Sequence, residues 1–581
     1  SIYTIENPYT FRIPASPTSE HIDVSTLRDN YALRAKFTPG DRLTITTSLS
    51  VENREGRRPI TVESLTNEST TAIIEITEPV DYSTASIDLG LEYFDDTIDM
   101  QLNNNLQIFT NTRRDEIIWD NPYQTECINL VDSVCVEERP AFGRAKVADD
   151  YTVHTLSFRP TIKISKNIRS INTLSYSKVT NTVNLAPLTT VTGVGEEFQK
   201  DLLDPDVRTL TVSSILSTRP LSDVSLNIKF RYNTHENDTP EIEEPPAYVM
   251  LDGSSTKYPR TARYTSYLTR TLTVDGNWSI INGLSLDAGL ENKDTIRRER
   301  EVEDENVKSF FFSLHPAISD RASGILGYRF DMKRGDYDPT YYKTIYDPDP
   351  KNDADQHPLM RAFDLSELNS HTVKAKFDFS PLDVLSLGAS LSFSRSEHID
   401  VTIGRNMSQT ESASISAEYT PFKDTLIYSQ YFYDRMTIES RYSWKSDSYN
   451  FIKPLSETME DSHDSYVIGF DYNAFEKISV TGNYSSHNST GTSVNMPAVR
   501  STTDTYDLKL SYKFRDDIPA ICFPFIQIKG LRINAGYYSE RYKRDDYTLD
   551  FDVTDPKDIF LGIMEPAYKL NIFSLSLAFY F

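Results

Sequence analysis

The last residues of the chain, LNIFSLSLAFYF, alternate between large apolar side chains and small or polar ones. Successive side chains of a β-strand point to opposite faces, so this segment predicts a strand with one apolar face. The residues of that face are Phe573, Leu575, Leu577, Phe579 and Phe581. An amphipathic helix would instead repeat its apolar residues with a period of about 3.6. The end of the chain therefore predicts a β-sheet with one apolar side.

The same alternation recurs along the whole chain, and helical periodicity is almost absent. It is clearest in the segments 87–93, 98–108, 224–232, 284–290, 373–379 and 385–393. We count about 21 such segments of roughly ten or more residues, the length that a tilted strand needs to cross a bilayer. Short turns at 38–41, 94–97, 165–167 and 380–383 alternate with long polar loops at 110–150, 235–262, 334–366 and 542–569.

The composition agrees with apolar faces on otherwise polar strands. The sequence contains 35 Tyr and 29 Phe, although its mean hydropathy is -0.46. So many aromatic rings need apolar surroundings, which a disordered polar chain does not provide. No uninterrupted apolar run approaches the length of about 18 residues that a membrane-spanning helix needs. The net charge of -25 argues against nucleic acid as a partner, because a phosphate backbone requires clustered Lys and Arg.

A meander of long strands, with short turns at one end and long loops at the other, is typical of an outer-membrane barrel. We therefore predict an all-β fold, a transmembrane antiparallel up-and-down β-barrel of about 22 strands, within a range of about 20–26. The short turns would be periplasmic and the long loops extracellular, in the outer membrane of a Gram-negative bacterium. Residues 1–22 would form an N-terminal segment with room for a first strand, and residues 23–581 a single barrel, closed by the C-terminal strand.

The lumen of such a barrel raises the question of what fills it. A closed barrel of about 22 strands is too wide for its own side chains to fill. Only about two dozen residues precede the first clear strand, so we expect no plug domain within this chain. The loops 235–262 and 334–366 are acidic and interrupted by proline, which predicts solvated external loops. We therefore expect a second protein inside the lumen, in contact with small and polar inward side chains.

Several short stretches carry a resemblance to a known family. They are 79–84 (PVDYST), 119–122 (WDNP), 337–342 (YDPTYY), 358–361 (PLMR), 364–365 (DL), 379–382 (FSPL) and 385–388 (LSLG). In order and spacing these stretches resemble the MtrB/PioB family, the porin-like sheaths of porin-cytochrome electron conduits. The recognisable pieces span roughly residues 79–440, and the remainder is similar in pattern only.

This resemblance implies a function in electron transfer across the outer membrane. The barrel would enclose a periplasmic multihaem c-type cytochrome and dock an extracellular multihaem cytochrome, and the chain itself would be no enzyme. Those partners would carry the haem c, because this chain has three cysteines and no CxxCH motif. The alternative is a general or ligand-specific diffusion porin with a water-filled lumen. A third reading, an enzyme site built across strands, has no HExxH motif or Gly-rich phosphate loop to support it.

Two loops contain candidate structural sites. Cys127 and Cys135 lie in the predicted outer loop 110–150, and the oxidising exterior predicts a disulfide between them rather than two free thiols. Loop 334–366 is rich in carboxylates that could hold calcium, with Asp347, Asp349, Asp353 and Asp355 as the candidates. Their spacing does not match an EF-hand loop, so a solvated acidic loop is the favoured interpretation.

Overall fold

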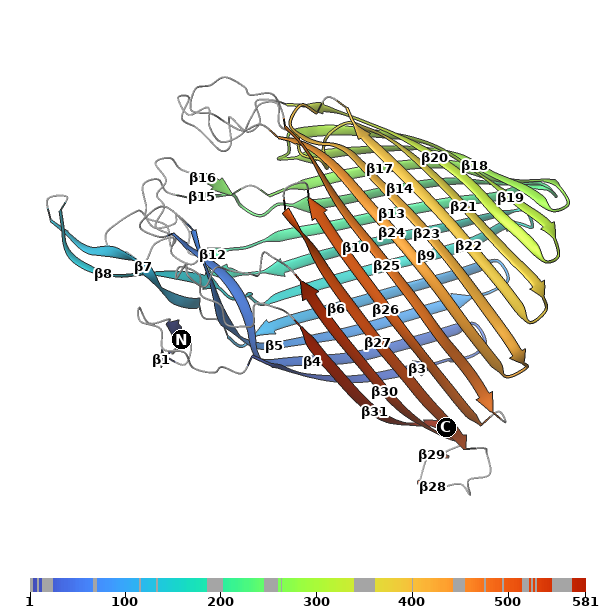
Figure 1. Cartoon of the computed structure of the whole chain (residues 1–581), viewed down its shortest axis with the longest axis horizontal. Helices are drawn as coiled ribbons and strands as arrows, with labels where there is room; N and C mark the ends of the chain where they lie inside the picture. Colours follow the sequence, from blue (N-terminus) through green and yellow to red (C-terminus); the bar gives the residue numbers. More distant parts are fainter. Residues whose placement is uncertain are drawn as a thin grey trace.

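The structure is a computed structural model, and its described part is built from β-strands alone. The described residues are 4–7, 10–12, 24–65, 71–113, 116–131, 134–184, 202–244, 260–262, 264–338, 361–399, 401–442, 455–474, 477–493, 496–514, 522–523, 526–527, 530–545 and 567–580. Within them, 21 strands belong to one sheet, which curls around a central space (Figure 1).

The strands of this large sheet follow one another along the chain. The first eleven are β3 (Thr26–Phe37), β4 (Leu43–Leu65), β5 (Thr71–Phe94), β6 (Ile98–Asn111), β9 (Tyr151–Ser165), β10 (Ile168–Asn181), β13 (Asp206–Leu221), β14 (Val224–Asn237), β17 (Ser266–Ile281), β18 (Leu284–Arg298) and β19 (Val302–Ser319). The remaining ten are β20 (Ala322–Tyr337), β21 (Leu368–Leu382), β22 (Leu385–His398), β23 (Gly404–Phe422), β24 (Thr425–Tyr442), β25 (Leu455–Ala474), β26 (Ile478–Ser493), β27 (Met496–Phe514), β30 (Gly530–Asp545) and β31 (Tyr568–Tyr580).

Five two-stranded sheets lie outside the large sheet in the described residues, one before β3 and four between later strands. They are β1 (Thr4–Asn7) with β2 (Thr10–Arg12), β7 (Glu116–Val131) with β8 (Val134–Lys146), β11 (Val183–Asn184) with β12 (Leu202–Leu203), β15 (Ile242–Glu244) with β16 (Arg260–Ala262), and β28 (Cys522–Phe523) with β29 (Ile526–Gln527). The described residues of segment 1–22 thus form the hairpin β1–β2, whose two strands pair with each other. The β7–β8 hairpin projects beyond the end of the barrel (Figure 1).

The topology confirms the predicted antiparallel meander. Each strand of the large sheet pairs antiparallel with the strand before it, from the pair β3–β4 to the pair β30–β31. The count of 21 in the described residues lies within the predicted range. In the described part of the chain, the pairings join β3 to β4 and β31 to β30, and no register joins β3 to β31. The described residues of the two terminal strands are therefore not paired with each other.

The two ends of the barrel differ as the sequence predicts. Short turns close the end that holds the C-terminus, and long connections gather at the other (Figure 1). We call these the turn end and the loop end. In the turn after β5, Asp95 Oδ1 accepts the backbone N–H groups of Thr97 and Ile98, both at 2.8 Å. In the turn between β17 and β18, Gly283 adopts a φ of 85°, which a residue with a Cβ rarely reaches.

Apolar side chains are distributed as in a shell rather than a globular core. Few apolar residues are buried in the described part, and Val80, Val302 and Leu365 are examples near the loop end. Many more large apolar side chains are exposed, and they recur at alternate positions of the strands. A search of the described residues found no helix with the length and apolar character for crossing a membrane.

Candidate functional site

The large sheet has one apolar and one polar face, and the strand register continues each face from strand to strand. In β22, Leu391 is 62 % exposed, and the alternate positions beside it hold Ser390 and Ser392. Leu391 pairs with Ala375 of β21 and Ala413 of β23. Exposed apolar residues can be stable against lipid, so the apolar face is the outward one. The polar face lines the lumen and is the candidate functional surface.

The C-terminal strand β31 follows the same rule. Phe573, Leu575 and Leu577 are all exposed on one face, opposite Tyr537, Ala535 and Ile533 of β30. These positions continue the outward face through the register of β27 and β30. Phe579 pairs with Leu531 at the backbone level, and its side chain and Phe581 lie outside the described residues. Closure of the barrel by this strand stays a prediction.

One part of the lumen surface carries charges that neutralise one another. This paired wall is the inward face of β14 and β17–β21. Its carboxylates contact basic side chains of the same wall. The pairs are Asp275 with Lys229 at 2.5 Å, Asp287 with His315 at 2.7 Å, Glu291 and Asp331 with Arg329 at 2.9 and 2.8 Å, and Asp378 with Lys376 at 2.9 Å. Towards the loop end, Glu305 contacts Arg297 at 3.1 Å and Lys333 at 3.0 Å.

The inward positions of β22 and β23 carry small side chains instead. They are Ser386, Gly388, Ser390, Ser392, Ser394 and Ser396 on β22, and Ser408, Thr410, Ser412, Ser414, Ser416 and Glu418 on β23. Short side chains leave the backbone of these strands close to the lumen. This stretch therefore allows a large occupant to come nearer than the paired wall does.

A third group of inward side chains is aromatic and lies near the loop end. The Phe109 ring of β6 stacks on Tyr151 of β9, with centroids 4.8 Å apart, and lies 5.4 Å from Tyr82 of β5. The Tyr82 hydroxyl donates to Glu78 at 2.8 Å, and Glu78 also forms an ion pair with Arg58. The described side chains here thus bind one another and stiffen the mouth.

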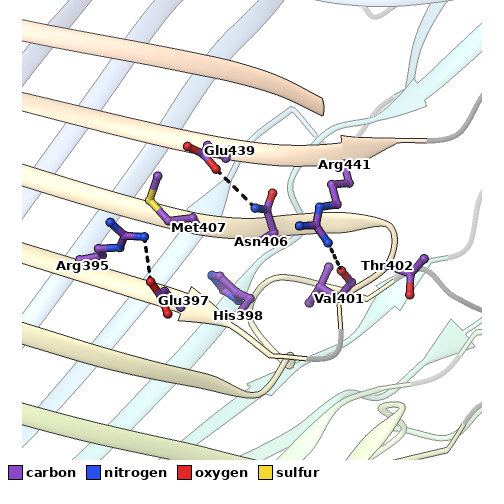
Figure 2. A pocket seen from close by; sticks show the side chains of 9 residues that line it. All are labelled: Arg395, Glu397, His398, Val401, Thr402, Asn406, Met407, Glu439 and Arg441. Carbon is purple, nitrogen blue, oxygen red and sulfur yellow. Dashed lines mark hydrogen bonds and ion pairs between the residues drawn. The ribbon is translucent and has the colours of Figure 1, made fainter. Parts of the chain in front are cut away.

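A hollow of about 430 Å³ lies at the loop end of β22–β24 (Figure 2). Arg395 and Glu397 line it and form an ion pair at 2.8 Å. They follow Phe393 at the next outward positions of β22. Arg441 reaches the Val401 carbonyl at 3.5 Å. Most of the drawn side chains are charged or polar, with Val401 and Met407 as the apolar ones, and none of those drawn is a nucleophile held against a base (Figure 2). The hollow therefore belongs to the outer rim above the apolar face.

Beside this hollow, segment 361–367 is fixed to the rim of the barrel. The Ser366 hydroxyl lies 2.6 Å from His398 Nδ1, and the Ile399 N–H donates to the Glu367 carbonyl at 2.8 Å. His398 lies beyond the apolar band, where burial, Arg405 and Lys333 lower its pKa to about 4. Ser366 is only 5 % exposed, so the pair anchors the segment rather than offering a nucleophile to substrate.

The sequence alone did not reveal this anchor, because its partners are far apart in the chain. The described end of loop 334–366 is packed rather than solvated, since Leu365 and Ser366 are buried. Arg300 Nη2 binds the Asp364 carboxylate at 2.8 Å, and the Arg405 guanidinium lies 4.2 Å from the centroid of Phe363. The stretches PLMR and DL were the available signal, and their described residues Arg361, Asp364 and Leu365 lie in this segment.

The structure describes only part of the two predicted loop sites. Backbone pairing places Cys127 opposite Glu138 and Cys135 opposite Leu130 in the β7–β8 hairpin. Their side chains lie outside the described part, so the disulfide stays a prediction. The calcium candidates Asp347, Asp349, Asp353 and Asp355 also lie outside the described residues. Among the residues that the structure does describe, no group of three or more His, Cys, Asp and Glu could hold a metal ion.

Comparison with known proteins gives one family and several similar folds. Residues 4–581 match the family described as "Putative outer membrane beta-barrel porin, MtrB/PioB". The chain is 22% identical over 407 residues to "Outer membrane protein MtrB" of Shewanella baltica (strain OS185), an alignment that covers 68% of this chain and 53% of that protein. The chain thus spans about half the length of this curated relative.

Solved outer-membrane transporters share the fold at low sequence identity. The transporter YddB from Escherichia coli gives a TM-score of 0.52 at 11% identity, over 95% of this chain and 75% of that one. The FrpB iron transporter from Neisseria meningitidis gives 0.50 at 8% identity, over 88% of this chain and 75% of that one. At these identities the likeness concerns the fold alone. Together with the match across nearly the whole sequence, it shows that the chain is an outer-membrane β-barrel of the MtrB/PioB family.

Proposed function

We propose that this barrel sheathes a periplasmic multihaem c-type cytochrome and docks an extracellular one, so that electrons cross the outer membrane along their haems. The observation that carries the proposal is the polar inward face, which continues from strand to strand around the lumen. The match to the MtrB/PioB family supports it. A polar, charged cytochrome cannot lie in hydrocarbon without a large desolvation cost. The polar bore removes this cost, and the apolar outer face keeps the assembly in the membrane.

In this role the chain carries no electrons itself. Its three cysteines include no CxxCH pair to attach haem c, so the haem belongs to the partners. The chain would hold the haem protein across the bilayer and exclude lipid and bulk water from it. The long loop-end hairpins, above all β7–β8, extend on the side where an extracellular cytochrome would dock (Figure 1).

A diffusion porin is the second candidate, because the matched family is described as a porin and the lumen face is polar. A water-filled pore needs polar inward side chains as much as a protein-filled one does. The two candidates differ in what occupies the lumen of the native protein.

The test is a mild detergent extraction from the native membrane, followed by a visible spectrum and a haem-stained gel. The proposal predicts a c-type haem spectrum and a separate CxxCH-rich polypeptide that stays with the barrel through high salt. A colourless barrel that conducts ions in a planar bilayer would favour the diffusion porin and contradict the sheath.

A further inference from the structure

One side of the lumen carries carboxylates with no cation of their own. This acidic wall comprises the inward positions of β22–β26, at 386–396, 408–418, 426–438, 459–471 and 479–491. It holds Glu418, Asp434, Asp461 and Asp471. Within the described chain, no Lys or Arg occupies an inward position of this wall, and none of the four carboxylates forms an ion pair. Arg395 and Arg435, on the same strands, point outward and pair with Glu397 and Glu460.

The contrast with the paired wall is informative. There, each of the inward carboxylates Asp275, Asp287, Glu291, Asp331 and Asp378 contacts a basic side chain. Lys or Arg neutralises four of these five carboxylates, and Asp287 is held by His315 and Asn277, so they offer little to another protein. On the acidic wall, Asp434 accepts a hydrogen bond from Ser412 at 2.5 Å, but its negative charge is uncompensated. Cations brought by another protein would compensate it and would gain from the low-dielectric surroundings of a filled lumen.

The same wall also exposes apolar side chains towards the lumen. Phe432 and Met436 of β24 and Met459 of β25 are 38%, 37% and 48% exposed. The register places Met436 opposite Asp461 and Phe432 opposite Ser465, so apolar and acidic side chains alternate in one patch. Aromatic and methionine side chains are enriched in the centres of protein interfaces, and methionine adapts to irregular partners. In a water-filled lumen these three apolar side chains would gain no stabilisation, whereas contact with a protein would bury them.

The shape of this side suits a bulky occupant. The inward faces of β22 and β23 are mostly serine, and the Tyr428 ring of β24 lies flat over Gly469 of β25, where a Cβ would fall 2.3 Å from the ring. Long inward arginine and lysine side chains, such as Arg329 and Lys333, stand on the paired wall instead. A protein in the lumen can therefore approach the acidic wall more closely.

We propose that the acidic wall is the surface against which the lumen cytochrome seats, through a face that combines Lys or Arg side chains with an apolar centre. This inference rests on the proposed function and deepens it. This seat would fix the rotation of the cytochrome about the barrel axis, because the acidic wall offers unneutralised carboxylates beside exposed apolar groups and the paired wall does not.

The test compares two double neutralisations in the native complex. Asp434→Asn with Asp461→Asn removes two charges of the acidic wall and keeps the acceptor oxygen for Ser412. The control, Asp88→Asn with Glu92→Gln, makes the same change on the inward face of β5, where Asp88 binds Ser48 and Asn105 and Glu92 binds Gln101. The heat-dependent gel mobility of each barrel shows that it is folded. The readout is haem retained per barrel as NaCl rises.

The proposal predicts that the acidic-wall variant loses its cytochrome at an NaCl concentration about threefold lower than wild type does, and that the control behaves as wild type. Loss of haem at the wild-type salt concentration in both variants, or an equal shift in both, would overturn the seating surface while the sheath function stands. A folded wild-type barrel without haem would instead overturn the sheath function, and the seating surface with it.

Discussion

The backbone N–H of Asn111 donates to Asp150 Oδ1 at 2.7 Å, and the Asn111 side chain donates to the Ala148 carbonyl at the same distance. Asn111 ends β6, and Asp150 immediately precedes β9. The two residues therefore clamp the base of the β7–β8 hairpin, which projects from the loop end (Figure 1). Asn111 is fully buried, so the clamp works without competition from water.

Replacement of Asn111 by Ala should loosen this hairpin. The change leaves buried polar groups without a partner, at a cost of about 1–3 kcal/mol in local stability. Limited proteolysis of the intact barrel would show faster cleavage within 116–146. Asn104→Ala is the control on the same strand, because Asn104 is only half-buried and bonds only His154 among the described contacts. Equal cleavage of the two variants would argue against the clamp.

The assignment of the two faces can be tested on adjacent residues of β31. Leu575 is 74% exposed on the outward face, and Ser574 lies on the inward one. Arg on the lipid face costs about 2–4 kcal/mol near the bilayer midplane, whereas Arg in a lumen stays hydrated. In urea titrations of barrels refolded into phosphatidylcholine vesicles, Leu575→Arg should reduce the free energy of unfolding by that amount and Ser574→Arg by less than about 1 kcal/mol. The reverse order would mean that the faces are exchanged.

The buried charge cluster at the loop end should matter more than an exposed pair. Glu305 lies between Arg297 and Lys333 with its side chain 5% exposed, whereas Lys376 and Asp378 are about half exposed. Removal of one partner from a buried pair costs about 3–5 kcal/mol, and loss of an exposed pair about 0–1 kcal/mol. Glu305→Ala should therefore lower the urea midpoint far more than Asp378→Ala. Similar midpoints would show that Glu305 is solvated.

The turn after β5 should contribute a pH-dependent increment of stability. The backbone N–H groups of Thr97 and Ile98 hold the pKa of the Asp95 carboxyl below its usual range. A lowered pKa in the folded state stabilises the fold above the unfolded pKa of about 3.9, and this gain disappears as pH falls through the folded pKa. Asp95→Asn keeps the acceptor oxygen but cannot titrate. The stability difference between the two proteins should shrink between about pH 5 and pH 2. A constant difference would contradict this role.

The disulfide between Cys127 and Cys135 remains a prediction that chemistry can decide. With three cysteines in the chain, a bridge leaves Cys522 as the single free thiol of the unfolded, unreduced protein. Mass mapping of peptides without reductant should find Cys127 and Cys135 linked. Three free thiols in material taken directly from the outer membrane would disprove the bridge.

Much of the fold could be predicted from single strands. The alternation of Leu385, Leu387 and Leu391 with serines identified a strand and its apolar face, and β22 begins at Leu385 as predicted but continues to His398. The turn at 94–97 was visible because its acidic residues interrupt two such patterns. The loop-end hairpins were missed, because β7 and β8 lack a regular alternation and were interpreted as loop 110–150.

The lumen surface could be predicted only as a polar face. Asp434 and Asp461 are close because β24 and β25 pair in one register, and their lack of a cation depends on side chains of strands far away in sequence. Arg435 and Asp434 are adjacent in the chain yet point outward and into the lumen, respectively, so their charges do not cancel across the wall. Net charge and local motifs cannot distinguish inward from outward charged side chains, whereas the strand register does.

The most direct measurement places the purified native complex in liposomes that contain an oxidised redox dye coupled to a polymer too large for the lumen, with a reductant coupled to the same polymer added outside. The account predicts that the dye is reduced in liposomes that carry the haem-containing barrel, and stays oxidised in liposomes that carry the same barrel stripped of haem. A dye that stays oxidised with the haem-containing barrel, or is reduced equally by the stripped one, would contradict the role of this chain as the sheath of an electron conduit.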